Sequence, residues 1–182
     1  PFLEPALTLV EGLKGKPIYF VPGNHEWASG YGLKKPLASL GVEILENTGV
    51  KINRGKSHLW LLGVDDPYLG RDDLDKALAV VDDDRPKILL AHAPNIFPKA
   101  LKAQISLVLV GHTHGGQIRL PFLGALVVPG QGFFPKYDYG LYRVANPRMI
   151  ITGGLGDSVI PVRVTLRPDL VLVTLTSSPV DS

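Results

Sequence analysis

The sequence predicts an α/β fold. Short apolar runs with the composition of buried strands alternate with segments in which apolar residues recur at helical spacing. Three of the runs, Ile18–Val21, Ile88–Ala91 and Ile105–Val110, lead directly into segments that contain histidine. Because open α/β sheets bind their ligands beyond the carboxyl ends of the strands, this repeated arrangement predicts a functional site at one edge of a sheet.

The composition indicates one globular domain, or part of one, of 182 residues with 45% hydrophobic and 20% charged residues. A formal net charge of +2 does not by itself indicate a nucleic-acid or membrane partner. The chain contains no cysteine, which excludes disulfides and thiolate ligands, so a metal would need nitrogen and oxygen ligands. No apolar run reaches the roughly 18 residues of a membrane-spanning helix. Because the sequence begins at Pro1 rather than Met, we expect an upstream segment to be missing from it.

Helical spacing predicts helices over residues 1–14, 31–40, 72–81 and 96–103, with Asp72 or Asp73 capping the third. Apolar composition predicts further strands over residues 42–45, 50–52, 59–62, 142–144, 149–152, 162–166 and 170–175. The last of these is nearly all Leu and Val, which is typical of a central strand. We find no internal repeat and no linker, and therefore expect one domain over residues 1–182.

The other motifs are arranged around the segment Gly111–Gln117, which contains His112 and His114. On an extended backbone alternate side chains point the same way, so both imidazoles are expected to face one place just beyond the strand. Gly115 and Gly116 then allow the chain to turn sharply and to lie close to whatever is bound.

Four of the five histidines, His25, His92, His112 and His114, follow predicted strands. A single histidine is more often a hydrogen-bonded polar residue than a ligand, but four placed alike favour a metal site. Asn24, next to His25, adds an amide oxygen, and imidazole nitrogen with amide oxygen suits borderline divalent metals. The fifth, His58, lies in an amphipathic strand and is interpreted as a surface or cross-strand residue.

Three acidic or basic groups have competing interpretations. Asp82–Asp84 follows a helix and is interpreted as a solvated loop rather than a metal site. Asp65 and Asp66 are interpreted as a turn before Pro67 rather than as ligands. Four cationic side chains are candidates either for attracting an anionic substrate or for structural ion pairs: Arg119, Lys136, Arg143 and Arg163.

Together, Gly23–Glu26, His92 and Gly111–His114 resemble three motifs of the calcineurin-like metallophosphoesterases. The flanking segments Leu89–Pro94 and Gly140–Tyr142 are similar to the bacterial YkuE/YaeI-like branch of that family. The resemblance covers nearly the whole chain. It implies a four-layer sandwich in which two mixed β-sheets are flanked by helices, here incomplete at its N-terminus.

The resemblance also implies hydrolysis of a phosphodiester or phosphomonoester by metal-bound hydroxide at a dinuclear centre. The ligands of one divalent ion resemble Asn24, His92 and His112, and a ligand of the other ion resembles His114. The identity of the two ions is left open among Mn, Fe, Zn, Ni and Mg. His25 resembles the histidine that contacts the phosphate and assists the leaving oxygen. Glu26 is expected to hold its loop rather than take part in the chemistry.

Two family motifs, Asp-x-His and Gly-Asp-x-x-Asp, are absent from the 23 residues that precede Asn24. All the candidate ligands are therefore neutral, and we expect this chain alone to bind at most one metal, weakly, and to hydrolyse phosphoesters poorly. Two alternatives stay open: a non-catalytic scaffold that retains the fold, and a separate chain that supplies the missing part. We expect a phosphoester substrate, no nucleic acid and a bacterial location in the cytoplasm or at a membrane, with any membrane association made through the missing segment.

Overall fold

The computed structural model describes residues 3–116, 119–120, 124–125, 127–128, 131–133, 135–143, 147–156 and 163–176. Its helices are α1 (Glu4–Gly12), α2 (Asn24–Ala28), α3 (Lys34–Ser39), α4 (Leu74–Leu78) and α5 (Phe97–Lys102), with 3₁₀ turns η1 (Pro94–Ile96) and η2 (His114–Gly116). Its strands are β1 (Tyr19–Phe20), β2 (Glu43–Ile44), β3 (Thr48–Arg54), β4 (Ser57–Gly63), β5 (Lys87–Leu90), β6 (Leu107–Val110), β7 (Arg119–Leu120), β8 (Gly124–Ala125), β9 (Val127–Val128), β10 (Gly132–Phe133), β11 (Gly140–Arg143) and β12 (Arg148–Ile151).

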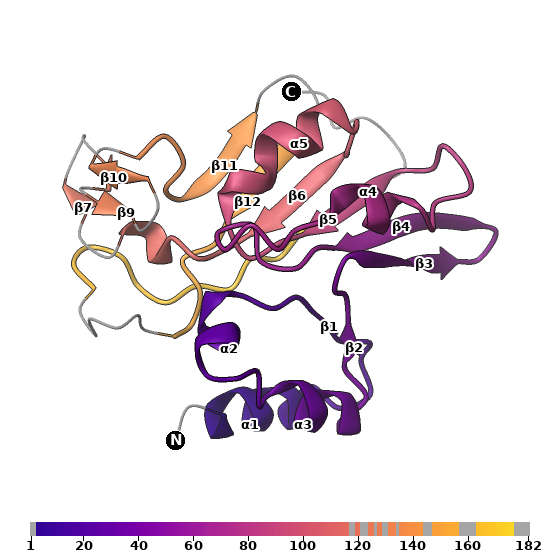
Figure 1. Ribbon diagram of the computed structural model, residues 1–182, viewed down its shortest axis with the longest axis horizontal. Helices are drawn as coiled ribbons and strands as arrows, with labels where there is room; N and C mark the ends of the chain where they lie inside the picture. The colour runs from indigo at the N-terminus through magenta and orange to yellow at the C-terminus, as the bar shows by residue number, and fades with distance from the viewer. Residues whose placement is uncertain are drawn as a thin grey trace.

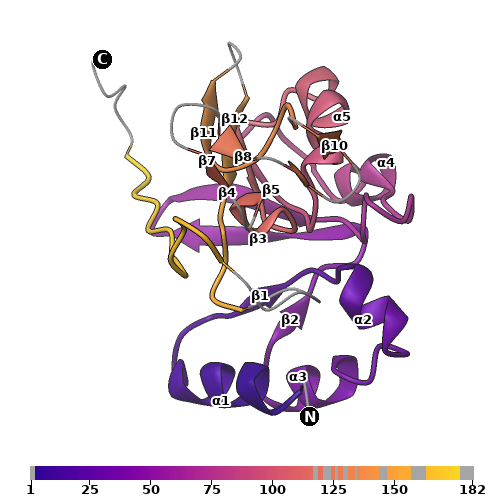
Figure 2. The ribbon, with the colours of Figure 1, turned by 90° about the vertical axis from the view of Figure 1, so that its left-hand side faces the viewer.

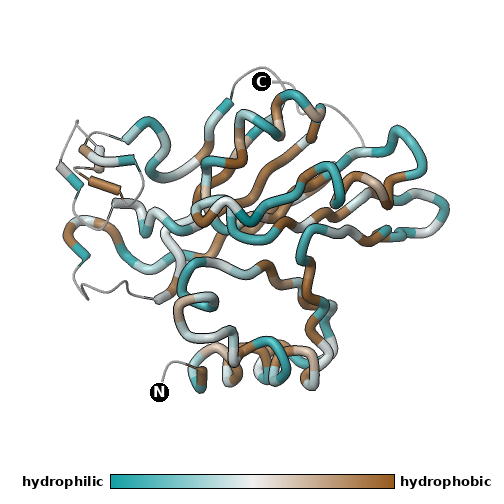
Figure 3. Tube along the Cα trace, in the orientation of Figure 1, coloured by the Kyte–Doolittle hydropathy of each residue, from teal (hydrophilic) through white to brown (hydrophobic). Residues whose placement is uncertain are grey.

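The core of the molecule is a six-stranded sheet with the order β11-β12-β6-β5-β4-β3. The four inner strands are parallel, and the edge strands β11 and β3 are antiparallel to their neighbours. Side chains such as Leu62, Leu89 and Val108 are completely buried, as expected for strands that are covered on both faces. Figure 3 shows the apolar residues concentrated along these strands.

The elements form layers (Figures 1 and 2). Helices α4 and α5 lie on one face of the sheet, where Ala77, Phe97 and Ala100 are fully buried. On the other side lies the parallel pair β1 and β2, with α1 and α3 beyond it. The layering confirms the predicted α/β fold. Within the described residues, the sheet that faces the six-stranded sheet consists of the two parallel strands β1 and β2.

The predicted helices form where the periodicity places them, but they are shorter. Residues 31–33 form a turn that precedes α3, and α4 spans only five residues of the predicted ten. The α4 helix begins at a cap, because the Asp73 carboxylate accepts a hydrogen bond from the Lys76 backbone N–H. No helix in the described part of the chain is long and apolar enough to cross a bilayer.

The prediction of a central strand over residues 170–175 is wrong. None of these residues pairs with a strand, and Leu170 and Leu172 are 79% and 93% exposed. Only Val173 packs against the core, on the face of the sheet opposite α4 and α5. Local composition gives strand propensity, but a strand also needs a neighbour with which to pair, and composition does not report that neighbour.

Two other predicted strands extend outside the described residues. Of the strand predicted over 162–166, Val164 forms an isolated bridge, and its carbonyl accepts a hydrogen bond from the Arg119 N–H. The strand predicted over 142–144 corresponds to the end of β11, and residue 144 lies outside the described part, as does Gln117.

Candidate metal centre

Three polar atoms from distant parts of the sequence converge beyond the carboxyl ends of β1, β5 and β6. The Nε2 atom of His92 lies 2.8 Å from Oδ1 of Asn24 and 2.9 Å from Nδ1 of His112. The imidazoles of His92 and His112 meet edge to face, with ring centroids 4.8 Å apart. An amide oxygen and two imidazole nitrogens therefore share one small region.

Local structure at the start of α2 explains the position of Asn24. The Glu26 carboxylate accepts a hydrogen bond of 2.8 Å from the Gly23 N–H and so closes the first turn of the helix. This contact gives Glu26 the loop-holding role expected from the sequence. A Cβ atom on Gly23 would lie 2.4 Å from Nδ1 of His92, so the close approach of this backbone to the imidazole requires glycine.

The backbone around His112 and His114 differs from the extended conformation that the sequence predicted. Both residues are left-handed, with φ of 68° and 48°, and His114 begins the η2 turn. Such angles are strained for residues with a side chain and cluster at functional sites. Gly116, with φ of 81°, makes the predicted sharp turn, and a Cβ there would lie 2.2 Å from Cβ of Ala125.

Thr113 holds this strained segment in place. Its side chain is buried, with 1% exposure, and its hydroxyl donates a hydrogen bond of 2.6 Å to the carbonyl of Asp138. The same hydroxyl accepts a hydrogen bond of 3.2 Å from the Gly115 N–H. The hydrogen bonds of the Thr113 hydroxyl thus fix the turn that contains His112 and His114.

The pKa of His92 shows that the other predicted histidines lie near it. Burial, together with the neighbouring imidazoles of His112, His25 and His114, lowers the pKa of His92 to about 3, and burial is the largest cause. The other three predicted histidines therefore lie within electrostatic reach of His92. Neutral imidazole is the form that binds metal, so this environment favours a ligand over a cation.

The donors suit a borderline divalent cation only in part. Their nitrogen and oxygen atoms have the chemistry that such a cation prefers. However, no three His, Cys, Asp or Glu side chains are grouped to hold a metal ion within the described residues. The convergent set comprises two imidazoles and one amide, and His25 and His114 lie near it.

Tyr68, in the connection after β4, also lies at this site, although motif reasoning did not select it as functional. The ring of Tyr68 packs against His112, with centroids 4.6 Å apart. The Asp65 carboxylate has structural partners: it accepts hydrogen bonds of 2.7 Å from the Trp27 indole and 3.0 Å from the Arg71 guanidinium. Asp66 accepts from the Tyr68 N–H at 2.9 Å, which confirms the predicted turn. For Tyr68, the sequence offered one signal of a functional role: an aromatic residue shortly after the pair Asp65–Asp66.

Two of the four cationic candidates, Arg119 and Arg163, make structural polar contacts. Arg119 forms an ion pair of 2.8 Å with Asp138. A guanidinium nitrogen of Arg163 donates to the carbonyl of Gly153 at 2.9 Å. The His58 ring, on β4, lies 2.6 Å from the carboxylate of Asp83 in the loop that precedes β5, and its cross-strand neighbour on β3 is Asn53.

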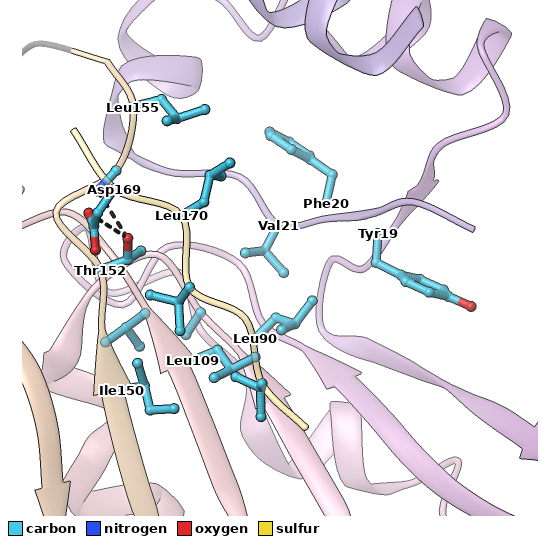
Figure 4. A pocket seen from close by; sticks show the side chains of 15 residues that line it. Tyr19, Phe20, Val21, Leu90, Leu109, Ile150, Thr152, Leu155, Asp169 and Leu170 are labelled. Atoms are coloured by element: carbon cyan, nitrogen blue, oxygen red, sulfur yellow. Dashed lines mark hydrogen bonds between the residues drawn. The ribbon is translucent and has the colours of Figure 1, made fainter. Parts of the chain in front are cut away.

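An apolar cavity of about 420 Å³ lies between the six-stranded sheet and the segment that contains β1 (Figure 4). Val21, after β1, and Leu170 face each other across it, and Leu90, Leu109 and Ile150 of the sheet form its floor. At its edge the Thr152 hydroxyl donates a hydrogen bond of 3.1 Å to Asp169.

Comparison with known proteins identifies the family of this chain. The family model for the calcineurin-like phosphoesterase matches residues 2–116. An uncharacterized metallophosphoesterase, YkuE, of Bacillus subtilis is 32% identical over 160 residues, covering 86% of this chain and 55% of the relative. The phosphodiesterase YaeI of Escherichia coli is 28% identical over 163 residues, covering 87% of this chain and 58% of the relative.

A transmembrane protein with metallophosphoesterase domain from Danio rerio is 38% identical over 173 residues, covering 86% of this chain and 38% of the relative. The chain thus spans between 38% and 58% of the lengths of these three relatives. No solved structure matches it significantly. From the family match and the placement of its motifs at the strand ends, the chain belongs to the calcineurin-like phosphoesterase family.

Proposed function

We propose that this chain is the larger part of the catalytic domain of a metal-dependent phosphoester hydrolase, with a phosphodiester as the preferred substrate. The convergence of Asn24, His92 and His112 on one region carries the proposal. The bond type follows the name of the Escherichia coli relative, a phosphodiesterase.

In this proposal the oxygen of Asn24 and the nitrogens of His92 and His112 hold one divalent cation, and His114 contributes to a second. When bound, divalent cations offset charge on the phosphate and lower the pKa of the attacking water. The chain's own contribution is to orient these donors: Gly23 lets His92 approach Asn24, and Thr113 fixes the segment from His112 to His114.

His25 has a separate role in the proposal. It lies exposed in the first turn of α2, directly after Asn24, and its charge acts on His92. An exposed imidazole beside the metal donors can reach a bound phosphate and donate a proton to the leaving oxygen near neutral pH.

The donor set carries no negative charge, and two divalent cations would bring four positive charges together. We therefore propose that the full-length protein adds carboxylates from a segment upstream of residue 1. Two observations support this: the chain spans about half the length of the Bacillus subtilis relative, and the cavity beside β1 is lined by Leu170, Val171 and Val173, which pair with no strand in the described structure. This chain alone then binds at most one cation, weakly.

Two relatives, from Danio rerio and Bos taurus, are named as transmembrane proteins. We extend the proposal to a membrane-associated location for the full-length protein, with the attachment outside residues 1–182. Fractionation of cells that express the full-length protein tests this, since recovery in the soluble fraction alone contradicts it.

Hydrolysis of a chromogenic phosphodiester by the full-length protein, with and without added Mn²⁺, tests the main proposal. The expected result is metal-dependent turnover that His92→Ala abolishes and His25→Ala lowers by about 100-fold or more, the scale of general acid catalysis. His58→Ala, on the surface of β4, is the control and keeps the wild-type rate. A folded, metal-supplied protein without turnover would instead favour the non-catalytic scaffold.

A further inference from the structure

Tyr68 is an aromatic residue placed at the edge of the candidate metal centre. It lies in the connection between β4 and α4, and its ring meets the His112 imidazole with centroids 4.6 Å apart and planes tilted by 37°. The residue remains 38% exposed. A large aromatic side chain thus lies against a candidate metal ligand and is still accessible from solvent.

The connection that carries Tyr68 is held by side chains of α2, of the loop between β2 and β3, and of the connection itself. Asp65 receives hydrogen bonds from Trp27 of α2 and from Arg71, and the Arg71 guanidinium also stacks 3.6 Å from the centre of the Trp27 ring. Asn47 accepts hydrogen bonds of 2.9 Å from the N–H groups of both Asp65 and Asp73. The two ends of the connection are therefore tied together at one amide.

The backbone on either side of Tyr68 is fixed in the same way. Its N–H donates to the carboxylate of Asp66, which is completely buried. The carbonyl of Pro67 accepts a hydrogen bond of 3.4 Å from Asn95. Because the backbone is already ordered, a ligand that packs on the ring loses little further conformational entropy on binding.

We propose that Tyr68 contacts the substrate and determines its specificity, by packing its ring against a flat aromatic group esterified to the phosphate. The inference rests on the proposed function, because it places the phosphate at His92 and His112. A phenol ring offers a polarisable face and no charge, so it favours planar aromatic groups over small alkyl groups. The preferred substrate class is therefore a phosphodiester that carries an aryl or nucleobase-like substituent close to the phosphorus.

The test compares two esters with the same leaving group, bis(p-nitrophenyl) phosphate and methyl p-nitrophenyl phosphate, in the full-length protein with Mn²⁺. Wild type is expected to show a lower KM for the diaryl ester. Tyr68→Ala raises the ratio of the diaryl KM to the methyl KM by about three- to tenfold, the range expected for one aromatic pair. Tyr68→Phe keeps the wild-type ratio. Leu69→Ala is the matched control, since Leu69 is an exposed apolar residue on the same connection.

A purely structural role for Tyr68 in supporting His112 gives a different result. It changes kcat for both esters by the same factor and leaves the ratio of their KM values at the wild-type level, which overturns the inference. A wild-type protein that hydrolyses both esters without an aryl preference also overturns the inference while the proposed function stands. A wild-type protein that hydrolyses neither ester overturns the proposed function, and the inference with it.

Discussion

The Nε2 atom of His92 lies 2.8 Å from the Oδ1 atom of Asn24, although 68 residues separate the two in the sequence. This contact joins the start of α2, in the layer of β1 and β2, to a residue two positions beyond β5 of the six-stranded sheet. The candidate centre therefore lies between two layers of the fold, and its geometry depends on how closely they approach.

Gly23 sets that approach, and Gly23→Ala is expected to separate the donors. The added Cβ would lie 2.4 Å from the His92 imidazole, so the ring or the backbone must move. We expect the affinity for Mn²⁺, measured by isothermal titration calorimetry, to fall roughly tenfold or more, as when outer contacts of metal ligands are lost. Gly12→Ala in α1, where a Cβ meets nothing within 4 Å, is the control. An unchanged affinity in Gly23→Ala contradicts the account.

Thr113→Val is expected to destabilise the protein. The substitution keeps the shape of a side chain that is 1% exposed but removes the hydroxyl that the Asp138 carbonyl and the Gly115 N–H use. Leaving such buried groups without that partner costs about 1–3 kcal/mol, measurable by urea unfolding. Thr8→Val, on an exposed position of α1, should leave stability within about 0.5 kcal/mol. Equal stability of the two variants rules out the role assigned to Thr113.

Trp27 and Asp65 are expected to be energetically coupled. The indole N–H donates a hydrogen bond of 2.7 Å to a carboxylate that is 8% exposed. In a double-mutant cycle with Trp27→Phe and Asp65→Ala, we expect a coupling energy of about 1–2 kcal/mol from chemical unfolding. Strictly additive effects would show that the hydrogen bond contributes nothing to stability.

Asp83 predicts a pH-dependent contribution to stability. Desolvation alone raises the pKa of its carboxyl, but hydrogen bonds from the Arg85 N–H, the Trp60 indole and His58 hold it at about 2, below its ordinary value of 3.8. Because the folded-state pKa is the lower one, the contribution is complete above about pH 4 and is lost as the pH falls through about 2.

The measurement is the thermal midpoint of wild type and Asp83→Asn at about pH 6 and about pH 2. We expect Asp83→Asn to melt at a lower temperature than wild type at the higher pH, with a smaller difference at the lower pH. Asp84→Asn, at the exposed neighbouring position, is the control and should follow wild type at both. A difference that stays constant with pH argues against these contacts.

Much of the fold could be predicted because the apolar composition of its inner strands is typical of buried strands. Ile88–Ala91 and Ile105–Val110 read as buried strands, and their histidines follow where a parallel sheet ends. Composition could not reveal that residues 170–175 pair with no strand in the described structure. Their Leu and Val residues satisfy the local pattern, but the segment has no neighbouring strand in the described structure.

The candidate site was predictable in its residue types more than in its geometry. Each of four histidines follows a predicted strand, and this shared position identified them as candidates: His25, His92, His112 and His114. In the structure the other three lie near His92. The left-handed backbone of His112 was not foreseen, because glycine is the residue that ordinarily signals such a conformation. Tyr68 was missed because its contact with His112 is made across 44 residues of chain by a connection whose course depends on Asp65.

The central claim is that Asn24, His92 and His112 together hold a divalent cation. The most direct test is anomalous diffraction at the metal edge from crystals of the protein supplied with Mn²⁺. The account predicts an anomalous peak between the Asn24 side-chain oxygen and the ring nitrogens of His92 and His112, and its loss in His92→Ala. A metal-loaded crystal whose only peaks lie away from these three side chains would contradict it.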